Sequence, residues 1–378
     1  MNRYFRHSWT SLSLLLTLLL LMACSSGGEE PRPKPTLSIY IYAPNSPVVT
    51  RSDVTSEGTT EENTIKKLQI WIFKTGQEDL IGYLELQGDQ LANLNSAQHH
   101  EVYRMEIDEA FASQPSDKRS KVDVYVLANV SVESCGDSKG ESTHRATPTE
   151  GSLETTHIAP KYFCPAQSET VATYGVPMSD VLYGVEVAGE SPVLKITTAK
   201  LKRRVSKIRF VFSSLTGKGA VTVTGVELDE NLIPDLEYLF QDETQYYSTY
   251  KPGRTMLLEN MPVKSNDAPY DYAYDEDRGD IVGFVQKIDQ GVKDGLLSDR
   301  SVYLRATDKK LAGNIYYKVG SDVTQRKVRF EMTKAGDFVR NSTWIIYGYF
   351  RAEQLEVETV DVTPWKDMGS VDHEVYNW

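Results

Sequence analysis

Hydrophobic and polar residues alternate along much of the chain from residue 36 onward. In the first such segment Leu37, Ile39 and Ile41 share one face, and the polar and tyrosine residues between them share the other. The segment from Ile65 to Phe73 is apolar on both faces, which predicts a central strand buried on two sides. The same pattern predicts further strands at residues 81–86, 102–107, 121–130, 193–197, 205–212, 221–228, 303–307, 314–319, 327–332, 343–350 and 355–362.

No segment of ten or more residues shows a convincing helical period. Residues 131–160 are rich in Ser, Thr, Gly and Glu and are expected to form a long loop, with a short helical turn near Leu153. The basic residues Lys202, Arg203 and Arg204 are interpreted as a solvated bend between two strands. Because each sheet must bury its apolar face against another, the pattern predicts an all-β protein with two β-sandwiches in tandem.

The N-terminal residues have the pattern of an export signal. Arg3 and Arg6 precede an apolar stretch, Leu12 to Met22, which is short for a membrane span and typical of a signal peptide over residues 1–23. It ends in Leu-Met-Ala-Cys24, which resembles a bacterial lipobox and predicts lipidation of Cys24. A plain signal peptide with an incidental cysteine is the alternative. Residues 27–35 are expected to form a tether.

Two further cysteines, Cys135 and Cys164, remain after this segment. An exported compartment permits a disulfide between them, and the sequence leaves the bonded and the free state equally open.

Charge and motif content argue against several functions. The chain has 41 Lys and Arg against 53 Asp and Glu, and a net charge of −12 disfavours binding to nucleic acid. The sequence has no nucleophile elbow, phosphate loop or zinc helix, and the neighbouring His99 and His100 would point to opposite faces of a strand. We therefore expect no enzyme activity, cofactor or metal site. An acidic loop at 271–280 contains an integrin-type tripeptide, Arg278-Gly279-Asp280, to which we give little weight.

The order of short motifs is more informative than any one of them. The lipobox is followed by one strand, by Thr50-Arg51 in an acidic linker, and by the strand at 65–73; the remaining motifs lie at 124–129, 176–179, 201–208, 340–341 and 363–365. This set resembles the fimbrillin family, the subunits of the type V pili of anaerobic Gram-negative oral and gut bacteria. The resemblance implies transthyretin-like sandwiches and a structural function.

The resemblance also implies an assembly mechanism. An Arg-specific protease would cut between Arg51 and Ser52, removing the lipidated segment with its first strand (Leu37, Ile39 and Ile41). The exposed groove would then accept a strand from the next subunit. The donor candidates are Leu355, Val357, Val360, Val362, Val371 and Val375 in the C-terminal segment. The alternative for this segment is an ordinary last strand followed by a docked terminus.

The expected organisation is a signal peptide (1–23), a lipidated propeptide (24–51), and two sandwich domains (52–192 and 193–378). Expected partners are other fimbrillin subunits, the Arg-specific protease, the outer membrane through the lipid, and a host or bacterial receptor. The precursor would reside in the outer membrane and the mature subunit in an extracellular fimbrium, supporting adhesion and biofilm formation. A tip or anchor subunit is one alternative. A surface glycan-binding lipoprotein is another, because the many Tyr and five Trp could stack on sugar rings.

Overall fold

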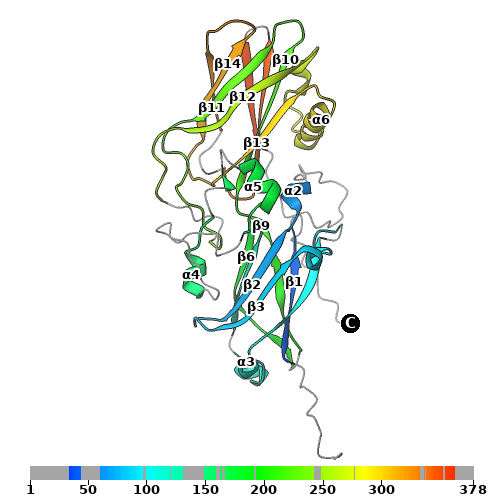
Figure 1. Ribbon diagram of the computed structural model, residues 1–378, viewed down its shortest axis with the longest axis vertical. Helices are drawn as coiled ribbons and strands as arrows, with labels where there is room; N and C mark the ends of the chain where they lie inside the picture. The colour runs from blue at the N-terminus through cyan, green and yellow to red at the C-terminus, as the bar shows by residue number, and fades with distance from the viewer. Residues whose placement is uncertain are drawn as a thin grey trace, which may run out of the picture.

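The protein consists of two β-sandwiches placed end to end (Figure 1). The computed structural model describes residues 34–43, 60–96, 99–119, 121–130, 149–158, 162–163, 167–190, 193–241, 248–275, 277–332, 336, 338–351 and 354–361. Within these residues strands dominate, as the alternation predicts, and the all-β fold with tandem sandwiches is confirmed. None of the helices among them is long and apolar enough to cross a membrane.

The first sandwich contains a four-stranded sheet in the order β4-β1-β8-β7 and a five-stranded sheet in the order β3-β2-β5-β6-β9. Its strands are β1 (Thr36–Tyr42), β2 (Lys67–Lys74), β3 (Leu80–Gln87), β4 (His100–Glu106), β5 (Val122–Ala128), β6 (Met178–Val185), β7 (Ala188–Glu190), β8 (Val193–Lys200) and β9 (Lys202–Arg203). Its helical segments are α2 (Thr60–Asn63), η1 (Gly88–Leu91), α3 (Glu109–Ala112), η2 (Ser116–Lys118), α4 (Glu150–Glu154) and α5 (Gln167–Tyr174).

The central position of β2 follows from its sequence. The strand pairs with β3 on one side and β5 on the other, and both of its faces are buried between Leu68 and Phe73. The two-sided burial predicted for this segment is therefore confirmed. The short helix α4 likewise confirms the helical turn expected near Leu153.

The second sandwich is formed by eight strands, in the order β15-β14-β11-β12-β10-β16-β17, with β13 paired to the same edge of β10 as the end of β12. Its strands are β10 (Ser206–Leu215), β11 (Val221–Leu228), β12 (Thr255–Asn266), β13 (Ser298–Leu304), β14 (Ala312–Val319), β15 (Arg326–Glu331), β16 (Thr343–Arg351) and β17 (Gln354–Asp361). The long strand β12 pairs with β11 along its length and with β10 only at its end, so it links the two layers.

A 13-residue helix contradicts the expectation that the chain has no long helix. Helix α6 (Ile281–Lys293) packs Phe284, Val285 and Ile288 onto the outer face of the sheet that contains β10 and β16 (Figure 1). The short segment η5 (Pro269–Tyr272) precedes it. Asp280 begins the helix by accepting a hydrogen bond from the Gly283 amide at 2.8 Å.

The basic residues 202–204 are not a solvated bend, and that interpretation is wrong. Arg203 pairs with Met178 as part of β9, and both Arg203 and Arg204 are buried where the two sandwiches meet. Arg203 donates to the Asn63 side chain, and Arg204 donates to Ser179 Oγ at 2.6 Å and to the Gln241 carbonyl at 2.9 Å. These hydrogen bonds replace the water that each guanidinium loses on burial.

A buried ion pair also lies between the sandwiches. The carboxylate of Glu62, in α2, contacts Lys207 Nζ of β10 at 2.7 Å and accepts a hydrogen bond from the Tyr303 hydroxyl of β13. All three side chains are buried. The segment that follows the proposed cut is therefore fixed to the second sandwich.

The pairing of β8 bears on the predicted domain boundary at residues 192 and 193. This strand was assigned by sequence to the C-terminal domain, and in the structure it pairs with β1 and β7 of the first sandwich. The domain limits themselves stay a prediction.

Candidate functional site: the slot of the first strand

Strand β1 lies inside its sheet, between two strands that are remote from it in sequence. It pairs antiparallel with β4, with Ile39 opposite Tyr103, and parallel with β8, with Leu37 opposite Leu194. The pairing with β8 shifts register by one residue between Ser38 and Tyr40. We call the space between β4 and β8 that β1 fills the β1 slot.

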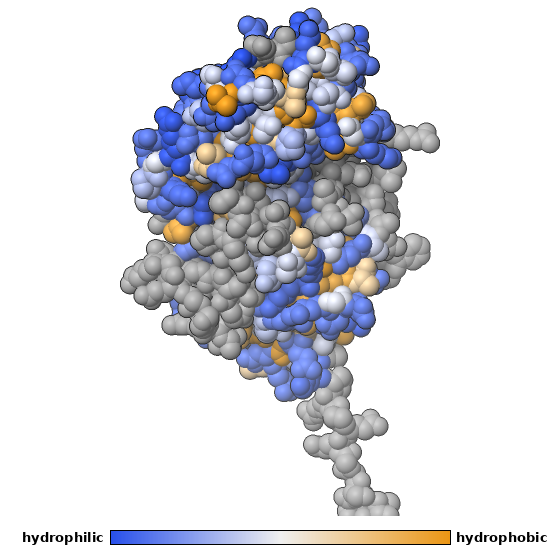
Figure 2. Space-filling model, turned by 45° about the horizontal axis from the view of Figure 1, so that its top comes forward, coloured by the Kyte–Doolittle hydropathy of each residue, from blue (hydrophilic) through white to orange (hydrophobic). Residues whose placement is uncertain are grey.

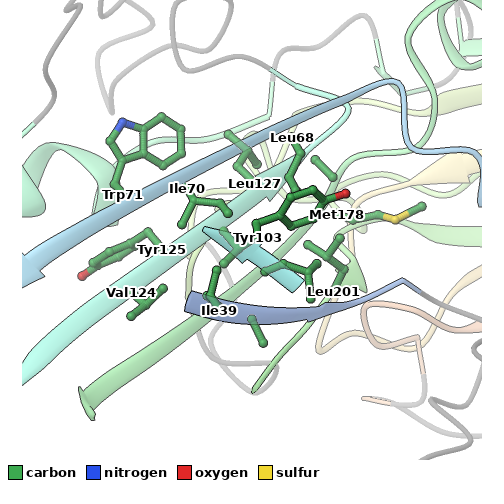
Figure 3. Packing of buried hydrophobic residues seen from close by; sticks show 14 of the residues in the cluster. Ile39, Leu68, Ile70, Trp71, Tyr103, Val124, Tyr125, Leu127, Met178 and Leu201 are labelled. Atoms are coloured by element: carbon green, nitrogen blue, oxygen red, sulfur yellow. The ribbon is translucent and has the colours of Figure 1, made fainter. Parts of the chain in front are cut away.

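The inward side chains of β1 are part of the sandwich core. Leu37, Ile39 and Ile41 are each 0% exposed. Figure 3 shows Ile39 beside Tyr103 and Leu201, facing the side chains of the opposite sheet. Full burial of such a side chain contributes about 1.5–3 kcal/mol, so these three contribute about 4.5–9 kcal/mol to the first sandwich.

Backbone hydrogen bonds extend the pairing beyond both ends of β1. The Pro35 carbonyl accepts from the Ile107 amide at 3.1 Å, and the Tyr42 carbonyl accepts from the Leu201 amide at 2.9 Å. The Ala43 amide donates to the His99 carbonyl at 2.8 Å. The segment from Pro35 to Ala43 is thus held along its whole length.

Removal of β1 would leave the slot open on both sides. The facing edges of β4 and β8 would lose their hydrogen-bond partners, and the core beneath would be exposed to water. An apolar groove lined by two unpaired strand edges is a template for the addition of another strand. This is the chemistry that the arrangement supports.

A half-buried carboxyl group braces the wall of the slot. Asp180 of β6 accepts hydrogen bonds from the Lys200 amide at 2.7 Å and from its neighbour Val181 at 3.0 Å. Lys200 lies opposite Tyr42 in the β1–β8 pair. Burial raises the pKa of Asp180 to about 6, although these hydrogen bonds and the nearby Arg204 lower it.

The surface of the molecule is consistent with a filled slot. On the face drawn in Figure 2, hydrophobic side chains form small separate patches among hydrophilic ones. Tyr40, on the outer face of β1, is 46% exposed, and Tyr42 stacks on His100 with ring centroids 5.3 Å apart.

Several residues singled out from the sequence lie outside the described part of the chain, so their predicted roles stay predictions. They are Cys24, Arg51, Ser52, Cys135, Cys164, Val362, Val371 and Val375. Of the other donor candidates, Leu355 is buried in the core of the second sandwich and Val357 packs against that core. Val360 belongs to β17, which pairs with β16 throughout.

The walls of the slot were not recognised from the sequence. Tyr103 and Met105 on β4, and Leu194 and Ala199 on β8, lie opposite β1 and are buried. Both segments alternate, which is a signal for strands but not for which strand lies beside which. No hairpin turn links either of them to β1, so the pairing could not be inferred from local sequence.

Other candidate features have structural explanations. The carboxylate of Asp280 caps α6, and Arg278 forms an ion pair with Asp275 at 3.0 Å, so the tripeptide 278–280 is the turn that leads into the helix. The described residues contain no group of three or more His, Cys, Asp or Glu side chains suited to a metal ion. Trp71 and Trp344, the two tryptophans in the described ranges, are buried in the cores and cannot stack on a sugar.

The architecture is thus two tandem sandwiches, the first of which is completed by an N-terminal strand without a hairpin partner. Comparison with known proteins agrees: the family described as major fimbrial subunit protein (FimA) matches residues 36–227. This match spans just over half of the 378 residues, and the chain belongs to this family. No curated protein matches the chain.

Comparison with solved structures finds matches at low sequence identity. A candidate cell adhesion protein from Parabacteroides distasonis has a TM-score of 0.50 and 14% identity, covering 88% of this chain and 98% of that one. The tip fimbrial protein Mfa3 from Porphyromonas gingivalis, truncated at its C-terminus, has a TM-score of 0.47 and 11% identity, covering 87% and 99%. A candidate cell adhesion protein from Bacteroides eggerthii has a TM-score of 0.46 and 13% identity, covering 89% and 97%.

Proposed function

We propose that this protein is a structural subunit of a type V pilus that is exported as a lipoprotein and assembles by strand exchange. Family membership places it among fimbrial surface proteins, whose partners are other fimbrial subunits. The proposed mechanism rests on the position of β1. This strand lies inside its sheet, and three of its side chains are fully buried. In this proposal β1 occupies the slot until a neighbouring subunit fills it.

A single cut would separate β1 from the rest of the protein. Strand β1 ends at Tyr42, and the next described segment begins at Thr60, with Arg51 between them in the sequence. Cleavage after Arg51 would release residues 24–51, including the lipid on Cys24, and would leave intact the other sixteen strands of the described residues. The new terminus would be Ser52, close in sequence to the anchored Glu62.

The incoming strand would come from the C-terminal segment of another subunit. Because β17 already completes the second sandwich of its own chain, we assign the donor role to residues 362–378, which include Val362, Val371 and Val375. Addition of this strand to the slot of the next copy is a heterologous contact that does not close on itself. The product is therefore a filament.

The test is maturation of the precursor by an Arg-specific protease. Purified precursor should be cut after Arg51 and then form filaments visible by electron microscopy and as oligomer ladders on gels. Arg51→Ala should block both steps. Arg32→Ala is the matched control, because Arg32 is the only other arginine between Cys24 and Ser52 and precedes β1. Normal filaments from the Arg51→Ala variant would refute the assigned cut.

The N-terminal residue of the protein isolated from cells separates the stalk function from its alternatives. A mature chain that begins at Ser52 fits a polymerised subunit. A chain that keeps a lipid on Cys24 fits an anchor subunit or a permanently anchored lipoprotein. A protein cut after Arg51 that remains monomeric, with β1 removed, would contradict a stalk function.

A further inference from the structure

The outer face of the β1 slot carries positive charge on both of its walls. Arg104 of β4 and Lys195 of β8 lie directly opposite Ser38, one on each side of β1. Both residues are exposed, and no ion pair is found for either one among the described residues. His100 and Lys200 flank Tyr42 in the same way, four residues further along β1.

Strand β1 offers nothing to balance this charge. Its sequence from Thr36 to Tyr42 contains no acidic residue, and the position between the two cations is a serine. Neighbouring strands are about 4.8 Å apart, so Arg104 and Lys195 start about 10 Å apart on either side of Ser38. Like charges held this close repel one another, and a carboxylate placed between them would relieve that repulsion.

We call the outer face of the two walls the rim of the slot. One carboxylate on this rim is paired with a cation of the propeptide. Glu106 of β4 lies opposite Thr36 and forms an ion pair with Lys34 at 2.7 Å. Lys34 belongs to the segment that leaves after the proposed cut. Glu106 would then lie two residues from Arg104 on the same face of β4, and Lys195, on the other wall, would keep its charge without a partner there.

We propose that the rim of the β1 slot selects an acidic donor strand, with Arg104 and Lys195 as the residues that determine specificity. The inference rests on the strand exchange proposed above and names the chemistry of the strand that is accepted. The occupant is the segment 370–378 of a second copy. In an extended strand Val371, His373 and Val375 share one face and Asp372 and Glu374 share the other, so the second face presents carboxylates to the rim when the first faces the core.

This charge pattern gives the exchange a direction. An incoming carboxylate between two cations is an interaction that β1 does not make, and cross-strand pairs of opposite charge stabilise a sheet. At the rim, the acidic strand therefore makes an interaction that the propeptide strand lacks.

The experiment measures binding of synthetic peptides to processed, full-length protein cut after Arg51. One peptide has the sequence of residues 370–378, and a second carries Asp372→Asn and Glu374→Gln. We expect the acidic peptide to bind about tenfold more tightly at low ionic strength, with the preference shrinking as salt is added. In the double variant Arg104→Gln/Lys195→Gln the preference should disappear. Lys218→Gln, an exposed charge in the second sandwich, is the matched control and should preserve it.

A charge-swap variant distinguishes a change of specificity from a loss of folding. The variant Arg104→Glu/Lys195→Glu should reject the acidic peptide and accept one with Asp372→Lys and Glu374→Lys. Equal binding of the acidic and neutral peptides to the unmodified protein would overturn the charge selection while leaving strand exchange intact. Failure of both peptides to bind a protein that still forms filaments would overturn the segment assigned as occupant. Failure of both together with failure to form filaments would contradict the proposed function itself.

Discussion

Truncation of one buried side chain in β1 should distinguish a placeholder from a permanent strand. Ile39 is fully buried opposite Tyr103, and Ile39→Ala removes three carbon groups from the core. The lost transfer free energy is about 2.4 kcal/mol at roughly 0.8 kcal/mol per group. The residual cavity brings the expected loss of unfolding free energy for the first sandwich to about 3–4 kcal/mol. The same change should leave the exchanged filament unaffected, because β1 is then no longer part of the subunit.

Hydrogen exchange measured by mass spectrometry can follow this effect in one sandwich at a time. Amides of β2 and β5 lie in the centre of the first sandwich, and those of β10 and β16 in the second. A loss of about 3 kcal/mol should speed exchange of the β2 and β5 amides in the precursor roughly a hundredfold, when exchange requires unfolding of the sandwich. The amides of β10 and β16 should change little.

The matched control is Ile70→Ala in β2, which is equally buried and lies in the opposite sheet. This variant should destabilise the precursor and the filament alike, since β2 remains in both. If Ile39→Ala weakens the filament as much as the precursor, β1 is retained after assembly and the placeholder argument is wrong. An effect below 1 kcal/mol in the precursor would show that the slot does not depend on β1.

Three further predictions concern the groups around the slot and the second sandwich. Burial raises the pKa of Asp180 to about 6. Its contribution to the unfolding free energy, about 3 kcal/mol, is therefore complete below about pH 4 and is lost as the pH rises through about 6. Asp180→Asn should abolish this pH-dependent contribution in urea unfolding series from pH 4 to 7. Glu62→Gln leaves the buried Lys207 without its carboxylate and should lower the unfolding free energy by about 3 kcal/mol, while the added change Lys207→Met should recover part of this loss in the same denaturation assay. Phe284→Ala should cost about 3–5 kcal/mol and speed hydrogen exchange in α6 and β16, but not in β2.

Most strands of the two sandwiches could be predicted, because a strand with one buried face shows a local alternation of apolar and polar residues. Leu37, Ile39 and Ile41 recur at every second position, and the residues of β11 do the same. The predicted segment at 221–228 coincides with β11. Strand β12 was missed because it belongs to two layers and carries polar residues and Pro262 within its 12 residues, so no single face is consistently apolar.

Helix α6 and the buried arginines could not be found in the same way. Two glycines interrupt the apolar residues of α6, and the acidic loop before it suggested an irregular segment; the capping residue Asp280 was the available signal. Arg203 and Arg204 are buried because Asn63, Ser179 and the Gln241 carbonyl supply acceptors. Those partners are distant in sequence, and a charged triplet by itself gives no indication of them.

The connections of β1 support the proposal that this strand can be replaced. Strands β2 and β3 are joined by a short turn, as are β16 and β17, so neither member of such a pair can leave without breaking a hairpin. Strand β1 is separated from β4 by residues 43–99 and from β8 by residues 43–192. No turn enforces its pairing, and its place is held only by side-chain burial and backbone hydrogen bonds. Any strand that supplies the same apolar face and better charges on the rim can supply these interactions equally well, and it can do so from another molecule.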